Sequence, residues 1–130
     1  MSMYVLDTDT CIYWLNGIES IREHVRQHGP RNLRITIMTL AELRYGAHNS
    51  RKVDENLRKI DQFLKKVKVL PLDIEAANRF GQLKADLQNT GQIISDFDVL
   101  IAAIALRFGG TVVTNNTEHF QRVRGLKREN

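Results

Sequence analysis

The sequence predicts an α/β fold in which helices cover both faces of a central parallel sheet. Short apolar runs of strand length alternate along the chain with longer segments that have helical periodicity. One helical segment, residues 99–106, is apolar on every side, which indicates a buried helix. Strands that are joined by helices form right-handed βαβ units with parallel strands. The 130 residues fit one compact domain that spans positions 1–130.

The first half of the chain predicts two strands and three helices. Apolar runs mark the strands, and Gly17 and the pair Gly29-Pro30 interrupt the helices. Thr39 and Glu42 have the spacing of a capping box, which predicts that a helix begins there. In chain order these elements are a strand over 3–6, helices over 8–16 and 18–28, a strand over 34–38 and a helix over 39–47.

The second half of the sequence predicts further helices and strands in alternation. Apolar residues recur at helical spacing over 52–67, and Asp73 is placed to cap the next helix, which Gly91 ends. The buried helix over 99–106 ends at Gly109-Gly110. The predicted strands of this half cover 67–70 and 111–114, and a basic tail follows.

Composition narrows the class of protein. Hydrophobic residues make up 42% and charged residues 26% of the chain, which is typical of a globular domain. No apolar run approaches the roughly 20 residues of a membrane helix, so no membrane role is expected. The chain enters strand-like sequence at once, and Cys11 has no partner for an internal disulfide, so we expect a cytoplasmic location. Cys11 is expected to be a buried packing thiol.

The net charge of +4 arises from 19 Lys and Arg against 15 Asp and Glu. Such charges usually form a solvated surface, but they also fit a rim that attracts a polyanion such as RNA. The four histidines are expected to be solvated surface residues. They are His24, His28, His48 and His119.

Acidic and amide residues stand where a parallel sheet brings ligands together. Asp7 and Asn116 follow predicted strands, Glu42 lies about one helical turn beyond another, and Asp98 lies in the first turn of the buried helix. Acids gathered around one point usually bind a cation. Each acid could instead be a helix cap or part of a capping box. Asp96 is favoured as a cap or a solvated residue.

The motifs resemble those of a known family. The blocks are Leu6-Asp7-Thr8-Asp9-Thr10, Thr39-Leu40-Ala41-Glu42-Leu43-Arg44-Tyr45-Gly46-Ala47, Asp98-Val99-Leu100-Ile101-Ala102-Ala103, and Val113-Thr114-Asn115-Asn116 with Phe120. In this order, over essentially the whole chain, they resemble PIN-domain ribonucleases, and more narrowly the VapC toxins of type II toxin–antitoxin (VapBC) systems.

The resemblance implies a three-layer α/β/α sandwich with a central parallel sheet of four to five strands. It implies that Asp7, Glu42 and Asp98 bind Mg²⁺ or Mn²⁺, with Asn116 where many PIN domains have an acid. Thr8, Thr114 and Asp96 are the supporting residues. The implied reaction is endonucleolytic hydrolysis of RNA by metal-activated water, which inhibits translation. The substrate would be a tRNA, and the blocks around Asp7 and Asn116 look most like the initiator-tRNA group.

The resemblance also implies two protein partners, a VapB-like antitoxin and a second copy of the chain in a homodimer. Two other functions remain open. Asp7-Thr8-Asp9 resembles the opening of haloacid-dehalogenase-type phosphatases, with Asp7 as nucleophile and Asp9 as acid/base, although Cys11 stands where that pattern has Thr or Val. Alternatively, the domain binds metal and RNA, or a protein partner, without cutting, because Asn116 removes one acid.

Overall fold

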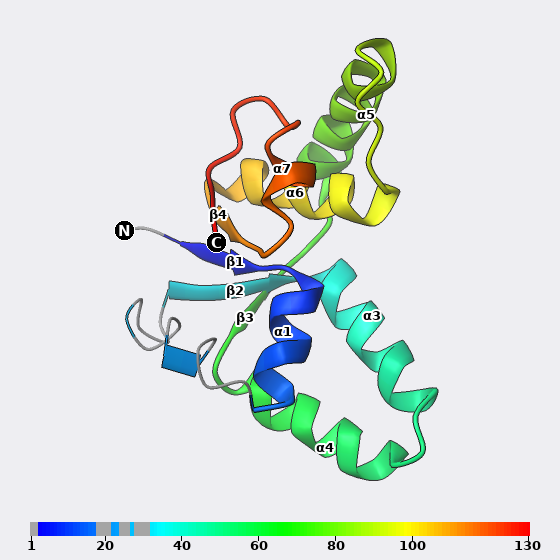
Figure 1. Ribbon diagram of the computed structural model, residues 1–130, viewed down its shortest axis with the longest axis vertical. Coiled ribbons are helices and arrows are strands. Elements are labelled where there is room, and N and C mark those ends of the chain that lie inside the picture. The colour runs from blue at the N-terminus through cyan, green and yellow to red at the C-terminus, as the bar shows by residue number, and fades with distance from the viewer. Residues whose placement is uncertain (1–2, 18–21, 24–26, 28–31) are drawn as a thin grey trace.

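A five-stranded parallel sheet forms the centre of the molecule (Figure 1). The computed structural model describes residues 3–17, 22–23, 27 and 32–130. The strand order is β3-β2-β1-β4-β5, so β1 lies in the middle of the sheet and the carboxyl ends of all strands lie at one edge. The strands are β1 (Tyr4–Leu6), β2 (Leu33–Thr36), β3 (Lys68–Leu70), β4 (Thr111–Val113) and β5 (Arg128–Glu129).

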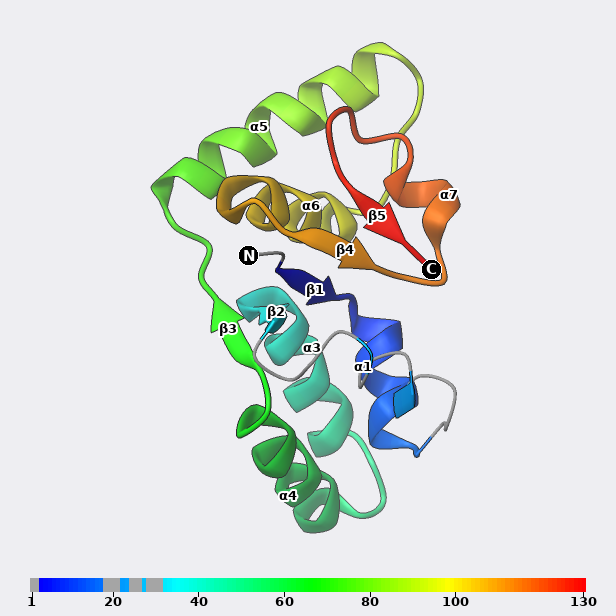
Figure 2. The ribbon, with the colours of Figure 1, turned by 90° about the vertical axis from the view of Figure 1, so that its left-hand side faces the viewer.

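Helices cover both faces of this sheet, which confirms the predicted α/β/α sandwich. Figure 2 shows α5, α6 and α7 on one side of the strands, and α1, α3 and α4 on the other. The predicted helix over 18–28 falls mostly outside the described residues. The described helices are α1 (Thr8–Leu15), α3 (Ile37–His48), α4 (Val53–Leu64), α5 (Ile74–Asn89), α6 (Asp96–Phe108) and α7 (Thr117–Phe120).

The side chains of the central strands point alternately to the two faces of the sheet, which divides the apolar core into two clusters. Val5 and Val112 pack with α5, α6 and α7, whereas Leu6 and Val113 pack with α1, α3 and α4. Successive side chains of a strand point to opposite faces, so each neighbouring pair serves both layers. Cys11 is fully buried in the second cluster, and burial raises the pKa of its thiol well above the ordinary value. The prediction of a packing thiol is therefore confirmed.

The buried helix α6 ends at the predicted glycine pair and begins at Asp96, three residues before the apolar segment over 99–106. The Ser95 hydroxyl accepts a hydrogen bond from the backbone of Asp98, and Gly109 ends the helix at a φ of +75°. The next residue, Gly110, approaches β1 so closely that an added Cβ would lie 2.7 Å from Val5 Cγ2. The α6–β4 turn thus holds β4 close against β1.

The predicted start of α3 is wrong by two residues. The structure ends β2 at Thr36, and the hydroxyl of this residue, rather than that of Thr39, caps the helix by accepting from the backbone of Thr39. The proposed capping box therefore does not form, and Glu42 lies in the second turn with its carboxylate free for other contacts. A Thr at the end of a buried strand competes with later Thr residues for the cap, and packing of the strand decides between them.

The C-terminal segment contains two elements where the sequence indicates only a basic tail. The helix α7 follows Asn116, and β5 pairs with β4 at Val112↔Arg128 and Val113↔Glu129. A two-residue edge strand made of charged residues carries no hydrophobic alternation, so pattern reasoning does not detect it. In the same half, Asp73 caps α5 as predicted. No described helix is long and apolar enough to cross a membrane.

Candidate active site

One cleft at the carboxyl edge of the sheet is lined by four of the predicted site residues. Asp7 leaves β1 and caps α1, Glu42 projects from α3, Asp98 lies in the first turn of α6, and Asn116 precedes α7. The cleft has a volume of about 510 Å³. Residues from distant parts of the chain meet here because parallel strands end at the same edge.

Asp7 is the most enclosed carboxylate of the cleft, with only 5% of its surface exposed. The Thr10 N–H donates to its Oδ1 at 2.9 Å, and the Thr114 hydroxyl donates to its Oδ2. Burial raises the pKa of Asp7, while these hydrogen bonds oppose the rise. The cleft therefore contains a negative charge whose solvation is only partly replaced, which favours a nearby cation.

Glu42 is held at the end of a chain of hydroxyl groups. The Thr8 hydroxyl donates to Glu42 Oε1 at 2.7 Å, and Thr8 Oγ1 lies 3.2 Å from Thr39 Oγ1. The Thr36 hydroxyl donates to Thr39 Oγ1 at 3.5 Å. Each hydroxyl has one hydrogen, so the bonds run in one direction, from Thr36 through Thr39 and Thr8 to the carboxylate.

Asp98 contacts a histidine that the sequence interpretation assigned to solvent. His119 Nδ1 lies 3.3 Å from Asp98 Oδ2 and 2.8 Å from Asn116 Nδ2. The ring is still 41% exposed, yet it touches two site residues, so the prediction of a solvated surface histidine is wrong for His119. The signal for this role is its position three residues after Asn116, within one helical turn.

The two contacts of His119 Nδ1 compete with each other. An unprotonated Nδ1 accepts from the Asn116 amide, whereas a protonated Nδ1 donates to the Asp98 carboxylate. One ring nitrogen does not perform both roles in the same state. Asn116 itself is fixed by its backbone N–H, which donates to Thr114 Oγ1 at 2.8 Å. Thr114 thus joins Asp7 and Asn116 in one network.

Asp96 lies outside the lining of the cleft. Its carboxylate forms an ion pair with Lys84 of α5 at 3.1 Å. Two residues that are two apart on a helix point in different directions, which explains why Asp98 enters the cleft and Asp96 does not. Asp96 therefore does not line the cleft, and its supporting role stays a prediction.

The donor chemistry of the cleft fits a hard divalent cation. Asp7, Glu42 and Asp98 offer carboxylate oxygens, and Mg²⁺ binds one or two carboxylates while it keeps several waters. Across residues 3–17, 22–23, 27 and 32–130, no three or more His, Cys, Asp or Glu side chains are grouped so that they could hold a metal ion. The acids thus line one open cleft, and each contacts hydroxyl, backbone or imidazole partners of its own.

Exposed aromatic side chains flank the acids, and sequence reasoning did not single them out. Tyr45 is 70% exposed on α3, one turn beyond Glu42, and Phe97 is 42% exposed beside Asp98. Both line the cleft. Large exposed aromatic residues at the mouth of a polar cleft are suited to stack against planar ligands such as nucleobases.

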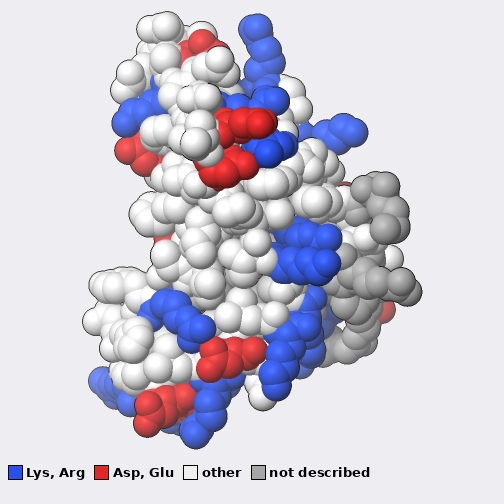
Figure 3. Space-filling model, turned by 180° about the vertical axis from the view of Figure 1, so that it is seen from behind, with Lys and Arg blue, Asp and Glu red and all other residues white. Residues whose placement is uncertain are grey.

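Basic residues do not form one continuous band on the face opposite to that of Figure 1. Figure 3 shows Lys and Arg side chains there in separate groups, with Asp and Glu beside them near both ends.

Comparison with known proteins identifies the family. The PIN domain profile matches residues 4–126. This chain is 38% identical over 130 residues to the tRNA(fMet)-specific endonuclease VapC of Shigella flexneri, which covers 99% of this chain and 98% of that protein. The chain belongs to the PIN-domain family, within its VapC group. PIN-domain ribonucleases in general depend on a metal ion.

Solved structures of VapC proteins share the fold over their whole length. DNA-bound VapBC from Salmonella typhimurium gives a TM-score of 0.93 at 36% identity, covering 99% of this chain and 98% of that one. VapBC2 from Rickettsia felis, bound to a DNA fragment from its promoter, gives 0.92 at 33% identity, with 98% of each chain covered. The VapC relationship also disfavours the phosphatase alternative that rested on Asp7 and Asp9.

Proposed function

We propose that this VapC-group protein is an Mg²⁺-dependent endoribonuclease toxin that cuts a tRNA and thereby inhibits translation. The observation that carries the proposal is the placement of Asp7, Glu42, Asp98 and Asn116 around one cleft in a PIN-domain chain. Initiator tRNA is the proposed substrate because the Shigella flexneri relative is named for it.

Asp7, Glu42 and Asp98 are the proposed ligands of the cation, Mg²⁺ or Mn²⁺. A divalent ion bound there polarises the phosphoryl oxygen and lowers the pKa of a water. Neighbouring residues hold the proposed carboxylate ligands in position. Thr114 and the Thr10 backbone orient Asp7, and Thr8 orients Glu42. A preorganised ligand set reduces the reorganisation that the reaction requires.

His119 positions the third carboxylate, that of Asp98, when its Nδ1 carries a hydrogen. This contact at 3.3 Å links α7 to the first turn of α6. Asn116 carries no charge, so the cleft has three carboxylates from the proposed ligand set where an acid at this position would give four. This lower charge favours one firmly bound ion over two.

Tyr45 and Phe97 are proposed to receive bases of the RNA on either side of the scissile phosphate. Stacking of a base on an aromatic side chain contributes about 1–3 kcal/mol and tolerates any base. The exposure of both rings at the cleft supports this role. Stacking of this kind requires unpaired bases, which a tRNA presents in its loops.

The proposed partners are a VapB-like antitoxin and a second copy of the chain. The similar structures from Salmonella typhimurium and Rickettsia felis are VapBC complexes, which supports an antitoxin. Exposed apolar residues beyond the cleft, including Ile74 at 82% and Ile93 at 65%, support a homodimer. We further propose that residues 1–130 form a single PIN domain and that the protein acts in the cytoplasm.

The decisive experiment maps RNA ends after brief exposure of tRNA to the purified protein. We expect cleavage at one site with Mg²⁺ or Mn²⁺, and none with a chelator or with the Asp7→Asn variant. Intact RNA in the presence of both ions, together with retained RNA binding, would instead indicate a non-catalytic binding domain. Release of phosphate from a small phosphate ester would instead support the phosphatase alternative if the Asp9→Asn variant lost this activity and the Glu42→Gln variant kept it.

A further inference from the structure

A buried threonine, Thr39, lies behind the hydroxyl group that holds Glu42. Its side chain belongs to the first turn of α3, three residues before Glu42, and none of its surface is exposed. Residues that are three apart on a helix share a face, so both side chains reach the start of α1. There the Thr8 hydroxyl lies 3.2 Å from Thr39 Oγ1 and 2.7 Å from Glu42 Oε1.

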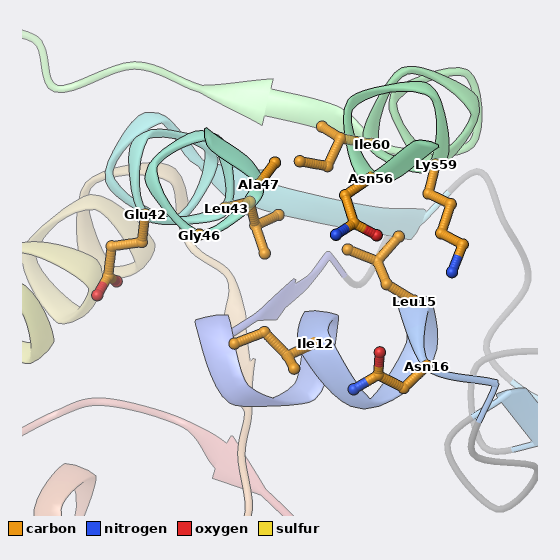
Figure 4. A pocket seen from close by; sticks show the side chains of 10 residues that line it. All are labelled: Ile12, Leu15, Asn16, Glu42, Leu43, Gly46, Ala47, Asn56, Lys59 and Ile60. Carbon is orange, nitrogen blue, oxygen red and sulfur yellow. The ribbon is translucent and has the colours of Figure 1, made fainter. Parts of the chain in front are cut away.

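The carboxylate of Glu42 is held by this hydrogen bond rather than by packing. Figure 4 shows the Glu42 side chain leaving α3 away from α4, with its carboxylate apart from apolar side chains such as Leu43 and Ile60. A long side chain keeps much of its rotamer freedom unless a partner holds it. The bond from Thr8 is short, as is typical of a hydroxyl that donates to a carboxylate. The orientation of Glu42 therefore depends on the Thr8 hydroxyl.

Thr39 is the donor in its contact with Thr8. The Thr8 hydroxyl has a single hydrogen, and the bond to Glu42 uses it. The hydrogen between the two threonine oxygens must then come from Thr39. A hydroxyl that accepts a hydrogen bond becomes a better donor, because neighbouring bonds polarise one another. Thr39 thus strengthens the bond that holds Glu42.

The same contact holds the side chain of Thr8 in one rotamer. Thr8 is only partly buried, so its hydroxyl could otherwise rotate about χ1 and bond to water. Thr36 and Thr39 are both 0% exposed, so water does not replace the contacts of Thr39. The Thr36 hydroxyl also donates to Thr39 Oγ1, but at 3.5 Å this bond is long and contributes less.

Packing alone does not require a hydroxyl group at position 39. Valine has nearly the shape of threonine and would fill the same space without a polar group that must be desolvated. The cap of α3 uses the backbone N–H of Thr39, which valine also provides. A buried hydroxyl costs little only where it is hydrogen-bonded, and the bonds of Thr39 lead to a proposed metal ligand.

We propose that Thr39 is a positioning residue of the cation site, which acts through Thr8 to hold the Glu42 carboxylate in the cleft. This inference rests on the proposed function, because it takes Glu42 as a ligand of Mg²⁺ or Mn²⁺. Thr39 does not line the cleft, so its effect on the cation is indirect. Residues of this kind reduce the rearrangement that a ligand undergoes when the cation binds.

The first test measures the binding of Mn²⁺ to the protein without RNA. Electron paramagnetic resonance of the free ion gives the affinity of the wild type, Thr39→Val and the matched control Thr39→Ser, which keeps the hydroxyl. We expect Thr39→Val to bind Mn²⁺ about tenfold more weakly, at the lower end of the range for residues that orient metal ligands. Thr39→Ser should bind like the wild type. Equal affinities of the wild type and Thr39→Val would overturn the proposal, and so would equal losses in both variants.

A double-mutant cycle tests whether Thr39 acts through Thr8. Adding Thr39→Val to Thr8→Val should cause no further loss of Mn²⁺ affinity, whereas independent effects would add. Additive losses would show another route and overturn the proposal. Circular dichroism of the metal-free variants establishes that they are folded. If Thr39→Val does not fold, Thr39→Ala is compared with Thr39→Ser in the same assay, with the same two outcomes.

Glu42→Gln separates this proposal from the proposed function. If Glu42→Gln binds Mn²⁺ like the wild type, Glu42 is not a ligand, and both the proposed ligand set and the role of Thr39 are wrong. If Glu42→Gln weakens binding and Thr39→Val does not, only the role of Thr39 is wrong. Weaker Mn²⁺ binding in both variants, with no RNA cleavage by the wild type, would overturn the ribonuclease function and leave the role of Thr39 standing.

Discussion

Asp7 and Asp98 belong to the same cleft, yet the protein holds them in different ways. Asp7 is 5% exposed, and both of its oxygens accept hydrogen bonds from the backbone of Thr10 and the hydroxyl of Thr114. The side chain of Asp98 is 23% exposed, and its contact is with His119 Nδ1, which also faces Asn116.

The two halves of the site therefore differ in how firmly they are held. Separate hydroxyl and backbone donors hold the two oxygens of Asp7, whereas Asp98 contacts one imidazole nitrogen that also faces Asn116. The Asp7 half is therefore preorganised, and the Asp98 half can adjust when a cation or an RNA strand arrives. Substitutions in each half test this contrast.

The largest effect is expected for Asp7→Asn. Changes to residues that only orient metal ligands already lower activity or metal affinity about 10–100-fold, so loss of a ligand should lower cleavage by at least about a hundredfold. Burial raises the pKa of Asp7, so its charge opposes folding of the metal-free protein at neutral pH. We therefore expect the variant to unfold at the same or a higher temperature without metal, as followed by circular dichroism.

The outcome that would contradict this expectation is specific. A variant that cleaves RNA like the wild type would remove Asp7 from the ligand set. A metal-free variant that unfolds well below the wild type would show that the two hydrogen bonds outweigh the burial of the charge.

Thr114→Val should weaken both activity and stability. The substitution leaves Oδ2 of the buried Asp7 and the backbone N–H of Asn116 without this hydroxyl partner. Unsatisfied buried groups of this kind cost about 1–3 kcal/mol, and loss of a ligand-orienting bond lowers activity about 10–100-fold. Thr111→Val, at the start of the strand β4 that Thr114 directly follows, is the matched control. Equal losses in both variants would point to the strand rather than to the hydrogen bond.

His119→Gln should weaken activity without a measurable change in stability. The ring is 41% exposed, so its removal costs little packing, but Asp98 and Asn116 are left without their shared imidazole partner. We expect cleavage to fall about tenfold, at the lower end of the range for residues that orient ligands. The exposed His48→Gln at the end of α3 is the control. A large drop in the unfolding temperature would indicate that His119 is part of the fold rather than of the site.

The smallest effect is expected for a substitution of Asp73. This residue gives the clearest contrast to Asp7, because both residues cap helices. The hydrogen bond that the Ala76 N–H donates lowers the pKa of Asp73 below its ordinary value of 3.8, and the hydrogen bond and charge of Arg107 add a smaller lowering. Its stabilising contribution is therefore fully present above pH 3.8 and is lost as the pH falls through the lower folded-state pKa. We expect Asp73→Asn to be less stable than the wild type near neutral pH, with the difference vanishing in acid. A difference that is independent of pH would contradict this assignment.

Much of the fold could be predicted because its signals are local. Apolar runs predicted the four strands, Asp73 predicted the start of α5, and the apolar segment over 99–106 predicted the buried helix. The same signals placed Asp7 and Asp98 at the sheet edge. Glu42 was found, but its local role was misassigned, because the hydroxyl that caps α3 belongs to Thr36.

Other features depend on residues that are distant in the chain. The sequence does not show that Thr8 donates to Glu42, that His119 reaches Asp98, or that the charged β5 completes the sheet. The sequence also does not rank the basic residues, whereas the structure places Arg58 and Lys59 in the lining of one groove between α1 and α4.

The sequence by itself determined the alternation of strands and helices, the two-sided burial of the sheet and the kinds of side chain at its carboxyl edge. These follow from periodicity and caps, which involve neighbouring residues only. Tertiary structure alone decided which side chain contacts each acid. Those contacts join residues 21 to 107 positions apart, and their geometry is set by the packing of whole elements rather than by any short stretch of sequence.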